Sequence, residues 1–542
     1  MLPLCHDEES HALLQLKESL VINKSASSDA SAYPKVVSWK VHGESGDCCS
    51  WDGVECDGDS GHVIGLNLSS SCLYGSIDSN SSLFHLFQLR RLNLADNDFN
   101  DSEIPSEIRN LSRLFDLDLS YSSFSGVIPS SLGNLTTLNY LDLSHNTFSG
   151  KIPSTFVNLL QLTYLSLSSN NFSSGTLHWL CNLTKLNYVD LARTNSYGEI
   201  PSCLGNLTQL TQLNLNLNEL TGQIPSWIGN QTQLILLGLG DNRLNGEIPP
   251  AICNLTSLVI LQLSNNNLSG KLPQCLGNIS NSTSVLDLRN NSFSGDIPEA
   301  FSSDCALRAL DFSQNQLEGK IPKSLANCPK LEILNIERNK INDAFPSWLG
   351  ILPELRAIDL SSNRFEGRIP DALGDLKELY SLNLSNNFLT GGIPPSLSNL
   401  KGLEALDLSQ NKLSGEIPVQ LAQLTFLAAF NVSHNLLSGS IPRGNQFQTF
   451  DNTSFDANPG LCGKPLSKKC GNGEDSLPAP EEDEGSGYLL EFGWKVVVIG
   501  YATGLVIGVL LGCAMNTRKY EWLVKNYFVN KGQNLKTRLR RN

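Results

Sequence analysis

The side chains with the most regular spacing in this chain are polar, and their chemistry is hydrogen bonding and aromatic contact. Three tyrosines recur every 24 residues: Tyr140, Tyr164 and Tyr188. Tyrosine and arginine are favoured anchors in protein interfaces, and nearby positions carry Tyr121, His145 and Arg193. We therefore predict a ligand-binding patch on these six residues. A structural ladder of tyrosines that only covers the strand edges fits the same spacing, and the sequence leaves both interpretations open.

No group of residues has the spacing of a catalytic or metal site. The eight histidines lack metal-ligand spacing, and the adjacent Cys48 and Cys49 do not form a redox pair of the Cys-x-x-Cys kind. An acidic row recurs as part of a repeated pattern: Asp142, Asp190, Asp287, Asp311, Asp359 and Asp407. We interpret this row as solvated strand faces rather than a metal site. The sequence thus predicts a protein that is no enzyme and holds no metal or cofactor.

The elements that must position these side chains come from an internal repeat, which reads LxxLxLxxNxLxGxIPxxLxxL. Its asparagine falls at Asn97, Asn146, Asn170, Asn218, Asn242, Asn266, Asn291, Asn315, Asn339, Asn363, Asn387, Asn411 and Asn435, with Ser122 and Thr194 in two further places and Ser71 in an irregular first one. The alternating leucines point inward from a short strand, and each asparagine side chain can bond the backbone of the turn. No repeat can bury its leucines alone, so neighbours must stack. The pattern predicts an α/β-type leucine-rich-repeat solenoid of about 16 repeats of 24 residues.

Cysteines mark the two ends of the predicted solenoid, which we place at residues 63–445. Residues 1–62 form a cysteine-rich N-terminal cap and residues 446–470 a C-terminal cap. We expect the pairs Cys5–Cys48, Cys49–Cys56 and Cys462–Cys470, although spacing alone does not fix connectivity. Within the solenoid, three pairs are spaced by about one repeat: Cys181/Cys203, Cys253/Cys275 and Cys305/Cys328. These are either disulfides between adjacent turns or buried thiols. Disulfides would imply an oxidising, secreted compartment.

Glycosylation signals agree with that compartment, because Asn-x-Ser/Thr sites occur from Asn23 to Asn452 and not beyond. Seven share one repeat position and predict a stripe of glycans along one flank: Asn110, Asn134, Asn182, Asn206, Asn230, Asn254 and Asn278. Repeats from Asn97 to Asn266 place no such site on an outward strand position. Later repeats do, at Asn290, Asn383 and Asn431. This contrast favours a ligand patch in the earlier repeats.

The C-terminal region predicts a membrane anchor. Residues 496–515 are an uncharged, mostly apolar run long enough to cross a hydrocarbon core of about 30 Å. An acidic linker, 471–495, precedes the run, and a basic tail, 516–542, follows it, so we expect the solenoid outside and the tail inside. The net charge of −14 therefore combines an acidic exterior with a basic interior. Four glycines spaced by four would form a helix-packing face: Gly500, Gly504, Gly508 and Gly512.

The caps, the Gly-x-Ile-Pro repeats, the acidic stretch, the glycine-spaced span and the short basic tail together resemble plant leucine-rich-repeat receptor-like proteins. The resemblance is to the Cf-type disease-resistance group and covers residues 5–542. The segments Asn445 to Phe450 and Gly460 to Gly463 carry it most specifically.

The resemblance implies a plasma-membrane receptor, single-pass with its N-terminus outside, that binds an extracellular peptide or protein ligand. Because the tail has neither a phosphate loop nor a catalytic loop, such a receptor signals through partners. The resemblance implies a leucine-rich-repeat receptor kinase adaptor, bound through the membrane helix, and a somatic-embryogenesis-type co-receptor kinase. It places the co-receptor at the last repeats, where Ala405, Ala428, Ala429 and Ser433 offer small outward side chains. No nucleic-acid partner is expected.

Two departures from the family pattern bear on function. Residues 1–4 lack a charged or apolar leader, so we expect a removed signal peptide or a truncated gene model. No insertion beyond two residues interrupts the period between Asn97 and Asn435, so the ligand site of the family's non-repeat island is not carried over. The leading hypothesis is an immune receptor. The alternatives are a developmental peptide-hormone co-receptor and a truncated, non-signalling decoy.

Overall fold

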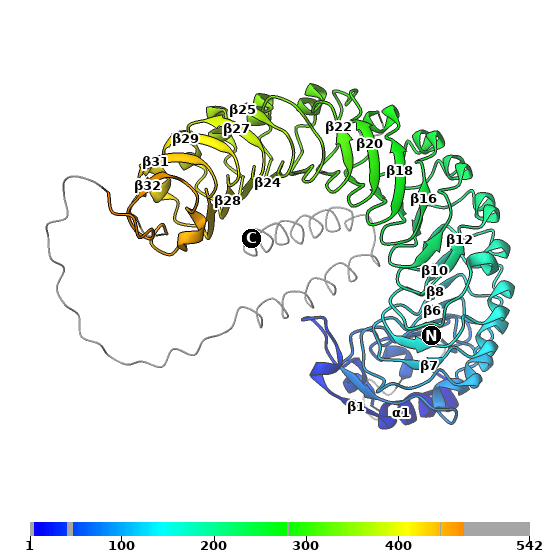
Figure 1. The fold of residues 1–542 in the computed structure, drawn as a ribbon. Coiled ribbons are helices and arrows are strands. Elements are labelled where there is room, and N and C mark those ends of the chain that lie inside the picture. The colour runs from blue at the N-terminus through cyan, green and yellow to red at the C-terminus, as the bar shows by residue number, and fades with distance from the viewer. Residues whose placement is uncertain (1–4, 41–46, 279–280, 445, 471–542) are drawn as a thin grey trace, which may run out of the picture. The chain divides into compact units, whose positions relative to one another are not determined.

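The computed structural model describes residues 5–40, 47–278, 281–444 and 446–470. These residues belong to two compact units, Met1–Pro273 and Gln274–Asn542. Each unit is a stack of repeats, as predicted, and in each the short helices lie on the side opposite the main sheet (Figure 1). The two units are described separately below.

Leu-x-Leu segments form the main sheet of the first unit, because alternate side chains point to opposite faces of a strand. After the antiparallel pair β2 (Val54–Cys56) and β3 (Val63–Asn67), the strands run parallel, one per repeat. They are β5 (Arg91–Asn93), β6 (Asp116–Asp118), β8 (Tyr140–Asp142), β10 (Tyr164–Ser166), β11 (Tyr188–Asp190), β13 (Gln212–Asn214), β15 (Leu236–Gly238) and β17 (Ile260–Gln262). Inward leucines such as Leu141 and Leu143 are fully buried. We call the opposite surface of this sheet the strand face.

Asparagine side chains connect each turn to its neighbour. The Asn146 amide donates to the carbonyls of Leu143 and Ser144 in its own repeat, at 3.2 and 3.1 Å, and to Leu119 in the preceding repeat at 2.7 Å. Its carbonyl oxygen accepts the backbone N–H groups of Ser122 and Phe124. Asn170, Asn242, Asn315, Asn363, Asn387, Asn411 and Asn435 donate in the same way. The predicted role of the asparagine is therefore confirmed.

Further short strands, which the sequence analysis did not predict, follow the asparagine in many repeats and form separate small sheets, which we together call the second sheet. In the first unit its strands are β7 (Ser125–Val127), β9 (Thr147–Ser149), β12 (Tyr197–Glu199), β14 (Glu219–Thr221), β16 (Asn245–Gly246) and β18 (Asn267–Lys271). Gly126 has a φ of 71°, and a Cβ there would meet the Glu103 side chain of the preceding repeat. Glycine tolerates this left-handed backbone without steric cost, which explains the Gly-x-Ile-Pro pattern.

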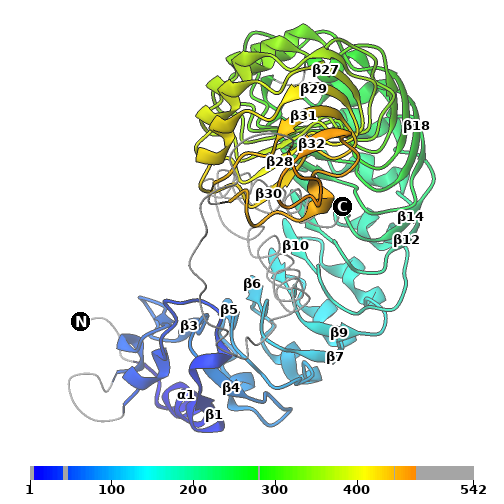
Figure 2. The same cartoon turned by 60° about the vertical axis from the view of Figure 1, so that its left-hand side comes forward.

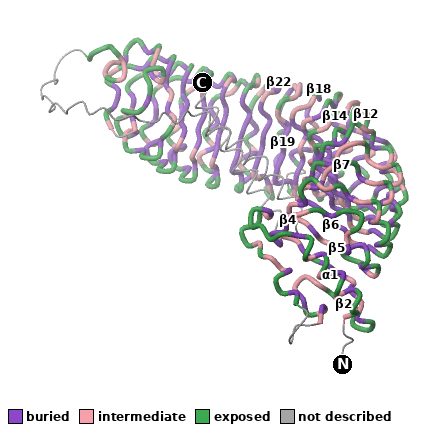
Figure 3. Tube along the Cα trace, turned by 90° about the horizontal axis from the view of Figure 1, so that it is seen from below, coloured by how far each residue is buried: buried purple, intermediate pink, exposed green. Residues whose placement is uncertain are grey.

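Short 3-10 helices begin directly after the proline of that pattern, except for Leu177–Asn182, which begins after Thr176. In the first unit they are Ser106–Asn110, Ser130–Asn134, Ser154–Asn158, Leu177–Asn182, Ser202–Asn206, Ser226–Asn230 and Pro250–Asn254. In the second unit they are Gln274–Gly277, Lys323–Asn327, Ser347–Ile351, Asp371–Asp375, Pro395–Asn399 and Val419–Gln423. Each repeat thus runs from strand to turn to helix, with buried residues inside each coil and exposed ones at the bends (Figure 3).

The second unit repeats this plan. Its main sheet contains β19 (Val285–Asp287), β21 (Ala309–Asp311), β23 (Ile333–Asn335), β24 (Ala357–Asp359), β26 (Ser381–Asn383), β28 (Ala405–Asp407) and β30 (Ala429–Asn431). Its second sheet contains β20 (Ser292–Asp296), β22 (Gln316–Glu318), β25 (Glu366–Arg368), β27 (Phe388–Gly391), β29 (Lys412–Glu416), β31 (Leu436–Ser440) and β32 (Gly460–Cys462).

The N-terminal cap covers the first repeats with helix α1 (Asp7–Ser19), seen in blue in Figure 2. Acidic residues occupy the first turn of α1 and Lys17 its last, as the helix dipole favours, and its buried face carries Ala12, Leu13 and Leu16. Strand β1 (Leu20–Ile22) then pairs with β4 (Leu73–Gly75). Further 3-10 turns are Lys24–Ala26, Lys35–Ser38, Cys48–Ser50 and Ser82–His85.

The C-terminal cap extends the asparagine ladder by one step that the sequence analysis missed. After the 3-10 turn Asn452–Ser454, the Asn458 amide donates to the carbonyl of Val432 at 2.9 Å. Its oxygen accepts the N–H of Leu437. Phe447, Phe450 and Phe455 cluster around Phe430 and close the apolar end of the stack.

The three cap disulfides form as predicted, and the solenoid cysteines for which the sequence left disulfides and buried thiols open are disulfide-bonded. The caps contain Cys5–Cys48, Cys49–Cys56 and Cys462–Cys470, and adjacent turns are joined by Cys181–Cys203 and Cys305–Cys328. Cys253 and Cys275 are disulfide-bonded as well. Among the described cysteines, Cys72 is a buried free thiol.

No helix within the described ranges is long and apolar enough to span a bilayer. The predicted linker, span with its four glycines, and tail lie outside those ranges.

Loss of one ladder asparagine should destabilise the stack. Asn146→Ala leaves several buried backbone groups without a partner, at about 1–3 kcal/mol each, so we expect the free energy of unfolding to fall by about 3 kcal/mol. Asn146→Ser should lower the free energy of unfolding less, because Ser122 occupies the equivalent place and its hydroxyl donates to the Leu94 and Ser120 carbonyls. The measurement is denaturant unfolding of the detergent-solubilised chain, with exposed Lys151→Ala as the control. Equal losses for Asn146→Ala and Lys151→Ala would contradict the role of the ladder.

Candidate ligand-binding site

The three predicted tyrosines form a continuous stack on the strand face of the first unit. Each is the first residue of its strand, and Tyr140, Tyr164 and Tyr188 are direct register partners. Ring centroids of both neighbouring pairs lie 4.1 Å apart, with interplanar angles of 13° and 14°. All three side chains are half-buried. The rings therefore cover one another's faces and present their edges on the strand face.

Carboxylates lie beside this stack and shape its electrostatics. The Tyr164 hydroxyl donates to Asp142 Oδ2 at 3.2 Å. Burial, followed by the charge of Asp142, raises the pKa of both Tyr140 and Tyr164 far above its ordinary value. Burial also raises the pKa of Asp142 to about 7, with Asp118 adding repulsion, and that of Asp190 to about 6. The phenols thus stay neutral, and Asp142 and Asp190 titrate close to mildly acidic pH.

The interpretation of the acidic row as solvated was wrong. Asp142, Asp190, Asp287, Asp311, Asp359 and Asp407 are all at most 4% exposed. Their carboxylates bend back to accept the N–H group two residues further along, as from Ser144, Ala192 and Ser361 at 2.9, 3.0 and 2.9 Å. The local turn therefore buries these side chains, and burial raises the pKa of Asp359 to about 7 and that of Asp407 above its ordinary value.

The other three predicted residues lie in a parallel row, in the turn after the strand. Tyr121, His145 and Arg193 all have a φ between 53° and 56°, the left-handed conformation that this turn position has throughout the chain. The rings of Tyr121 and His145 stack at a centroid distance of 4.0 Å, and Arg193 is exposed. Burial and then the charge of Arg193 lower the pKa of His145 to about 4. The six residues thus lie in two rows rather than one cluster, and Arg193 stacks on none of the rings.

The strand face continues beyond the tyrosines, which the sequence analysis missed. Tyr188 pairs in register with Gln212, Gln212 with Leu236, and Leu236 with Ile260. In the other direction Tyr140 pairs with Asp116. Reading every twenty-fourth residue from Tyr140 would have found this row.

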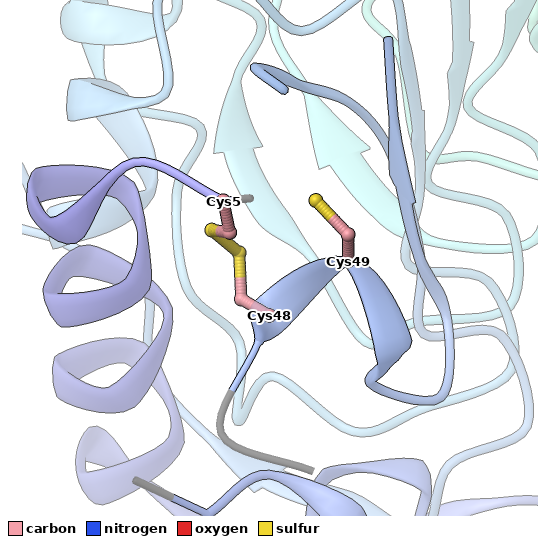
Figure 4. A group of neighbouring side chains, drawn as sticks. All are labelled: Cys5, Cys48 and Cys49. Atoms are coloured by element: carbon pink, nitrogen blue, oxygen red, sulfur yellow. A yellow bond between two sulfur atoms is a disulfide. The ribbon is translucent and has the colours of Figure 1, made fainter. Parts of the chain in front are cut away.

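Among the described residues, one group of possible metal ligands lies close together. It consists of Cys5, Cys48 and Cys49. Cys5 and Cys48 share a disulfide, and the sulfur of Cys49 lies beside it (Figure 4). Because Cys49 is itself bonded to Cys56, none of the three offers a thiolate, and this group is a structural staple.

The predicted glycan sites Asn110, Asn134, Asn182, Asn206, Asn230, Asn254 and Asn278 are all exposed, and six of them end one of the 3-10 helices. They therefore lie away from the strand face. Asn383 differs, because it is buried and its amide donates to Asp359 Oδ2 at 3.0 Å. A glycan on Asn383 does not fit this fold, so this site does not support the contrast between earlier and later repeats.

Comparison with known proteins identifies the chain's repeats along most of its described length. A leucine-rich repeat region matches residues 168–391, and a leucine-rich repeat N-terminal domain matches residues 6–57. Further leucine-rich repeats match residues 377–437, 88–111, 113–135 and 137–159.

Curated relatives fix the type of repeat protein. Receptor-like protein 7 of Arabidopsis thaliana is 50% identical over 125 residues, which is 23% of this chain and 11% of that protein. Receptor-like protein Cf-9 of Solanum pimpinellifolium is 44% identical over 110 residues, 19% of this chain and 12% of that protein. The chain belongs to the plant leucine-rich-repeat receptor-like proteins of the Cf type. The matched segments span only about a tenth of the length of these two receptor-like proteins.

A solved structure of a plant receptor supports the same fold for this receptor-like chain. The peptide hormone receptor RGFR1 in complex with RGF2 has a TM-score of 0.60 and 31% identity, covering 76% of this chain and 65% of that one. The fold is therefore that of a plant leucine-rich-repeat ectodomain.

The buried carboxylate of Asp142 should make stability depend on pH. Its pKa is raised on folding, so the native state binds more protons than the unfolded state between about pH 4 and pH 7, and stability falls as pH rises through that window. Asp142→Asn removes this loss, and Asn93 and Asn214 show that the position accepts asparagine. We expect the free energy of unfolding of the variant to exceed that of wild type by about 2 kcal/mol at pH 8 and by less at pH 4.5. The measurement is chemical unfolding at both pH values, with exposed Asp304→Asn as the control. A difference that does not change with pH would contradict the burial of a titrating carboxylate.

Proposed function

We propose that this chain is a cell-surface receptor that binds an extracellular peptide or protein ligand on its solenoid and acts in plant defence. In this proposal the receptor signals through partner receptor kinases. Its relatives Receptor-like protein 7 and Cf-9 are receptor-like proteins, and the RGFR1 structure contains a peptide hormone ligand. These likenesses support a receptor rather than an enzyme.

The half-exposed tyrosine stack is the observation that carries this proposal. Its ring edges and the exposed Arg193 lie on one surface of the first unit. Stacked rings are held in place, so little side-chain entropy is lost when a ligand binds to them. The exposed asparagines of the predicted glycan sites end the helices of the opposite side, which leaves this surface open.

The remaining domains supply the membrane link in this proposal. The linker 471–495, the span 496–515 and the tail 516–542 would make a single-pass plasma-membrane protein with the solenoid outside. The four glycines of the span would contact a leucine-rich-repeat receptor kinase adaptor. A somatic-embryogenesis-type co-receptor kinase would dock at the last repeats, where Ala428 is exposed but Ala405 is buried.

Removing the tyrosine stack should abolish the response to ligand. Glutamine occupies the same strand position at Gln212, so the combined change Tyr140→Gln, Tyr164→Gln and Tyr188→Gln fits the fold. In leaves that express the full chain, we expect an apoplastic elicitor fraction to give less than a tenth of the wild-type response. The control is Tyr197→Gln, which alters an exposed tyrosine in the second sheet. An unchanged response at normal surface level would refute the site. A response to endogenous growth peptides instead of elicitor would favour the developmental co-receptor.

The glycine face should be needed for the adaptor and not for the ligand. Gly504→Leu combined with Gly508→Leu adds bulk that keeps a partner helix at a distance. We expect co-purification of the adaptor kinase with the full chain to fall about tenfold, while surface level is unchanged. Val506→Leu is the matched control on a different face of the predicted helix. Undiminished co-purification would show that the adaptor uses another surface.

A further inference from the structure

A row of exposed side chains runs along the second sheet of the second unit. Each member directly follows a ladder asparagine, and in chain order they are Lys340, Arg364, Phe388, Lys412 and Leu436. Backbone bonds between repeats keep them in line, as where the Arg364 N–H donates to the Ile341 carbonyl at 2.8 Å. All five side chains are exposed. We call this row the basic strip.

The positive charge of the basic strip is not neutralised within the part of the chain that the structure describes. None of its three cations takes part in an ion pair there. Lys340 donates to the neutral side-chain oxygen of Gln316 at 3.2 Å, and the Lys412 ammonium lies 5.1 Å from the centroid of the Phe388 ring. Glu366 is exposed two residues after the arginine of the strip but makes no ion pair with it. The strip therefore presents unmatched positive charge on both sides of an aromatic ring.

The repeat itself does not require this charge, as the same row of the first unit shows. Its members, each directly after the ladder position, are Thr147, Asn171, Asn195, Glu219, Arg243 and Asn267. The two charged members pair with one another, because Arg243 Nη2 lies 3.4 Å from Glu219 Oε1. That row satisfies its own charges, whereas the basic strip does not.

The described chain ends at one end of the basic strip. Strands β27, β29, β31 and β32 follow one another in the second sheet (Figure 2). Asn458 takes the ladder position beside β32, so Pro459 continues the strip by one step. Lys468 Nζ donates to the Pro459 carbonyl at 2.6 Å, which adds a fourth ammonium at this end. The disulfide of Cys470 with Cys462 of β32 holds the last described residue nearby.

The sequence that follows Cys470 is the acidic linker, which lies outside the described residues. Its first carboxylates fall in two groups, at 474–475 and 481–484, and the apolar segment 477–480 separates them. The basic strip has the matching order, because two cations lie on one side of Phe388 and one on the other. Charge and apolar character thus alternate in the same way along both segments.

We propose that the acidic linker of this chain, residues 471–495, docks on the basic strip, with the carboxylates of 481–484 at Lys340 and Arg364 and the segment 477–480 over Phe388. The five steps from Pro459 to Lys340 span about 24 Å, and the eleven residues from Cys470 to Glu481 reach up to about 36 Å when extended, so the linker is long enough. Docking removes the exposed ring from water and shortens the tether between the solenoid and the predicted span. The contact is independent of the ligand and of the tyrosine stack.

Zero-length carbodiimide crosslinking of the full chain in detergent, read by mass spectrometry, tests this contact, because the reagent joins a carboxylate to a lysine amine only where the two touch. We expect Lys340 and Lys412 to be linked to residues 474–484 at least about tenfold more than the control lysines. The controls are Lys330 and Lys401, which are exposed after the 3-10 helices of the same unit. Salt at about 1 M, where the Debye length is about 3 Å, should remove most of the linkage.

Two variants test the two sides of the contact. Arg364→Gln with Phe388→Gln keeps both reporter lysines, and Gln316 shows that the row accepts glutamine. It should lower both linkages about fivefold. The neutral-linker variant should do the same without altering any repeat, and it combines Glu481→Gln, Glu482→Gln, Asp483→Asn and Glu484→Gln. Arg243→Gln, in the same row of the first unit, is the matched control and should change neither linkage.

Three results would overturn the inference. They are linkage of Lys340 and Lys412 no greater than that of Lys330 and Lys401, undiminished linkage in the neutral-linker variant, and linkage only between two copies of the chain. Mixing unlabelled with isotope-labelled chain distinguishes the last result, because linkage within one chain gives no mixed-isotope pairs. None of these measurements includes the ligand, so each outcome leaves the proposed receptor function standing.

Discussion

The buried asparagine amide is the interaction on which the rest of this structure depends. Each one bonds carbonyls in its own repeat and in the preceding repeat, and accepts N–H groups from that preceding repeat as well. A strand of three residues makes few backbone hydrogen bonds of its own. The asparagine side chain therefore supplies hydrogen-bond partners for backbone groups of the turn that would otherwise have none. The bonds also hold neighbouring repeats at one fixed register. Ser122 and Thr194 retain part of this pattern through their hydroxyl groups.

Because the register between neighbouring repeats is fixed, equivalent positions of successive repeats form rows on the surface. Side chains 24 residues apart become neighbours, so tyrosine rings stack at 4.1 Å and Tyr121 meets His145. The same geometry places Asp118, Asp142 and Asp190 in one row, where burial keeps their pKa values high. A structural role of the tyrosine stack and a binding role are therefore compatible, because stacking covers the ring faces and leaves each side chain partly exposed.

Much of this organisation is predictable from particular residues. The leucine and asparagine period predicts the strands and the ladder. Cysteines one repeat apart indicate candidate pairs, and the structure shows Cys181–Cys203 and Cys305–Cys328 as disulfides rather than buried thiols. Other features depend on neighbours that the pattern does not encode. The burial of Asp142 follows from a side chain folding back to Ser144, and Asn458 joins the ladder from a cap with a different spacing. The second sheet has weak side-chain alternation, because glycine occupies most of its strands. The tyrosine centre of the candidate site was predicted, whereas the continuation of its row to Asp116 and Gln212 emerges only when the strands are placed in register.

The central claim is that ligand contacts the edges of the tyrosine stack. Hydroxyl-radical labelling of tyrosine rings in the full chain, mapped by mass spectrometry with and without the active apoplastic fraction, tests it most directly. Tyr33 and Tyr197 are 51% and 46% exposed and lie off the stack, so they serve as internal references. The account predicts that ligand protects Tyr140, Tyr164 and Tyr188 while Tyr33 and Tyr197 react as before. Protection of Tyr197 or Tyr33 with undiminished labelling of the stack would contradict it.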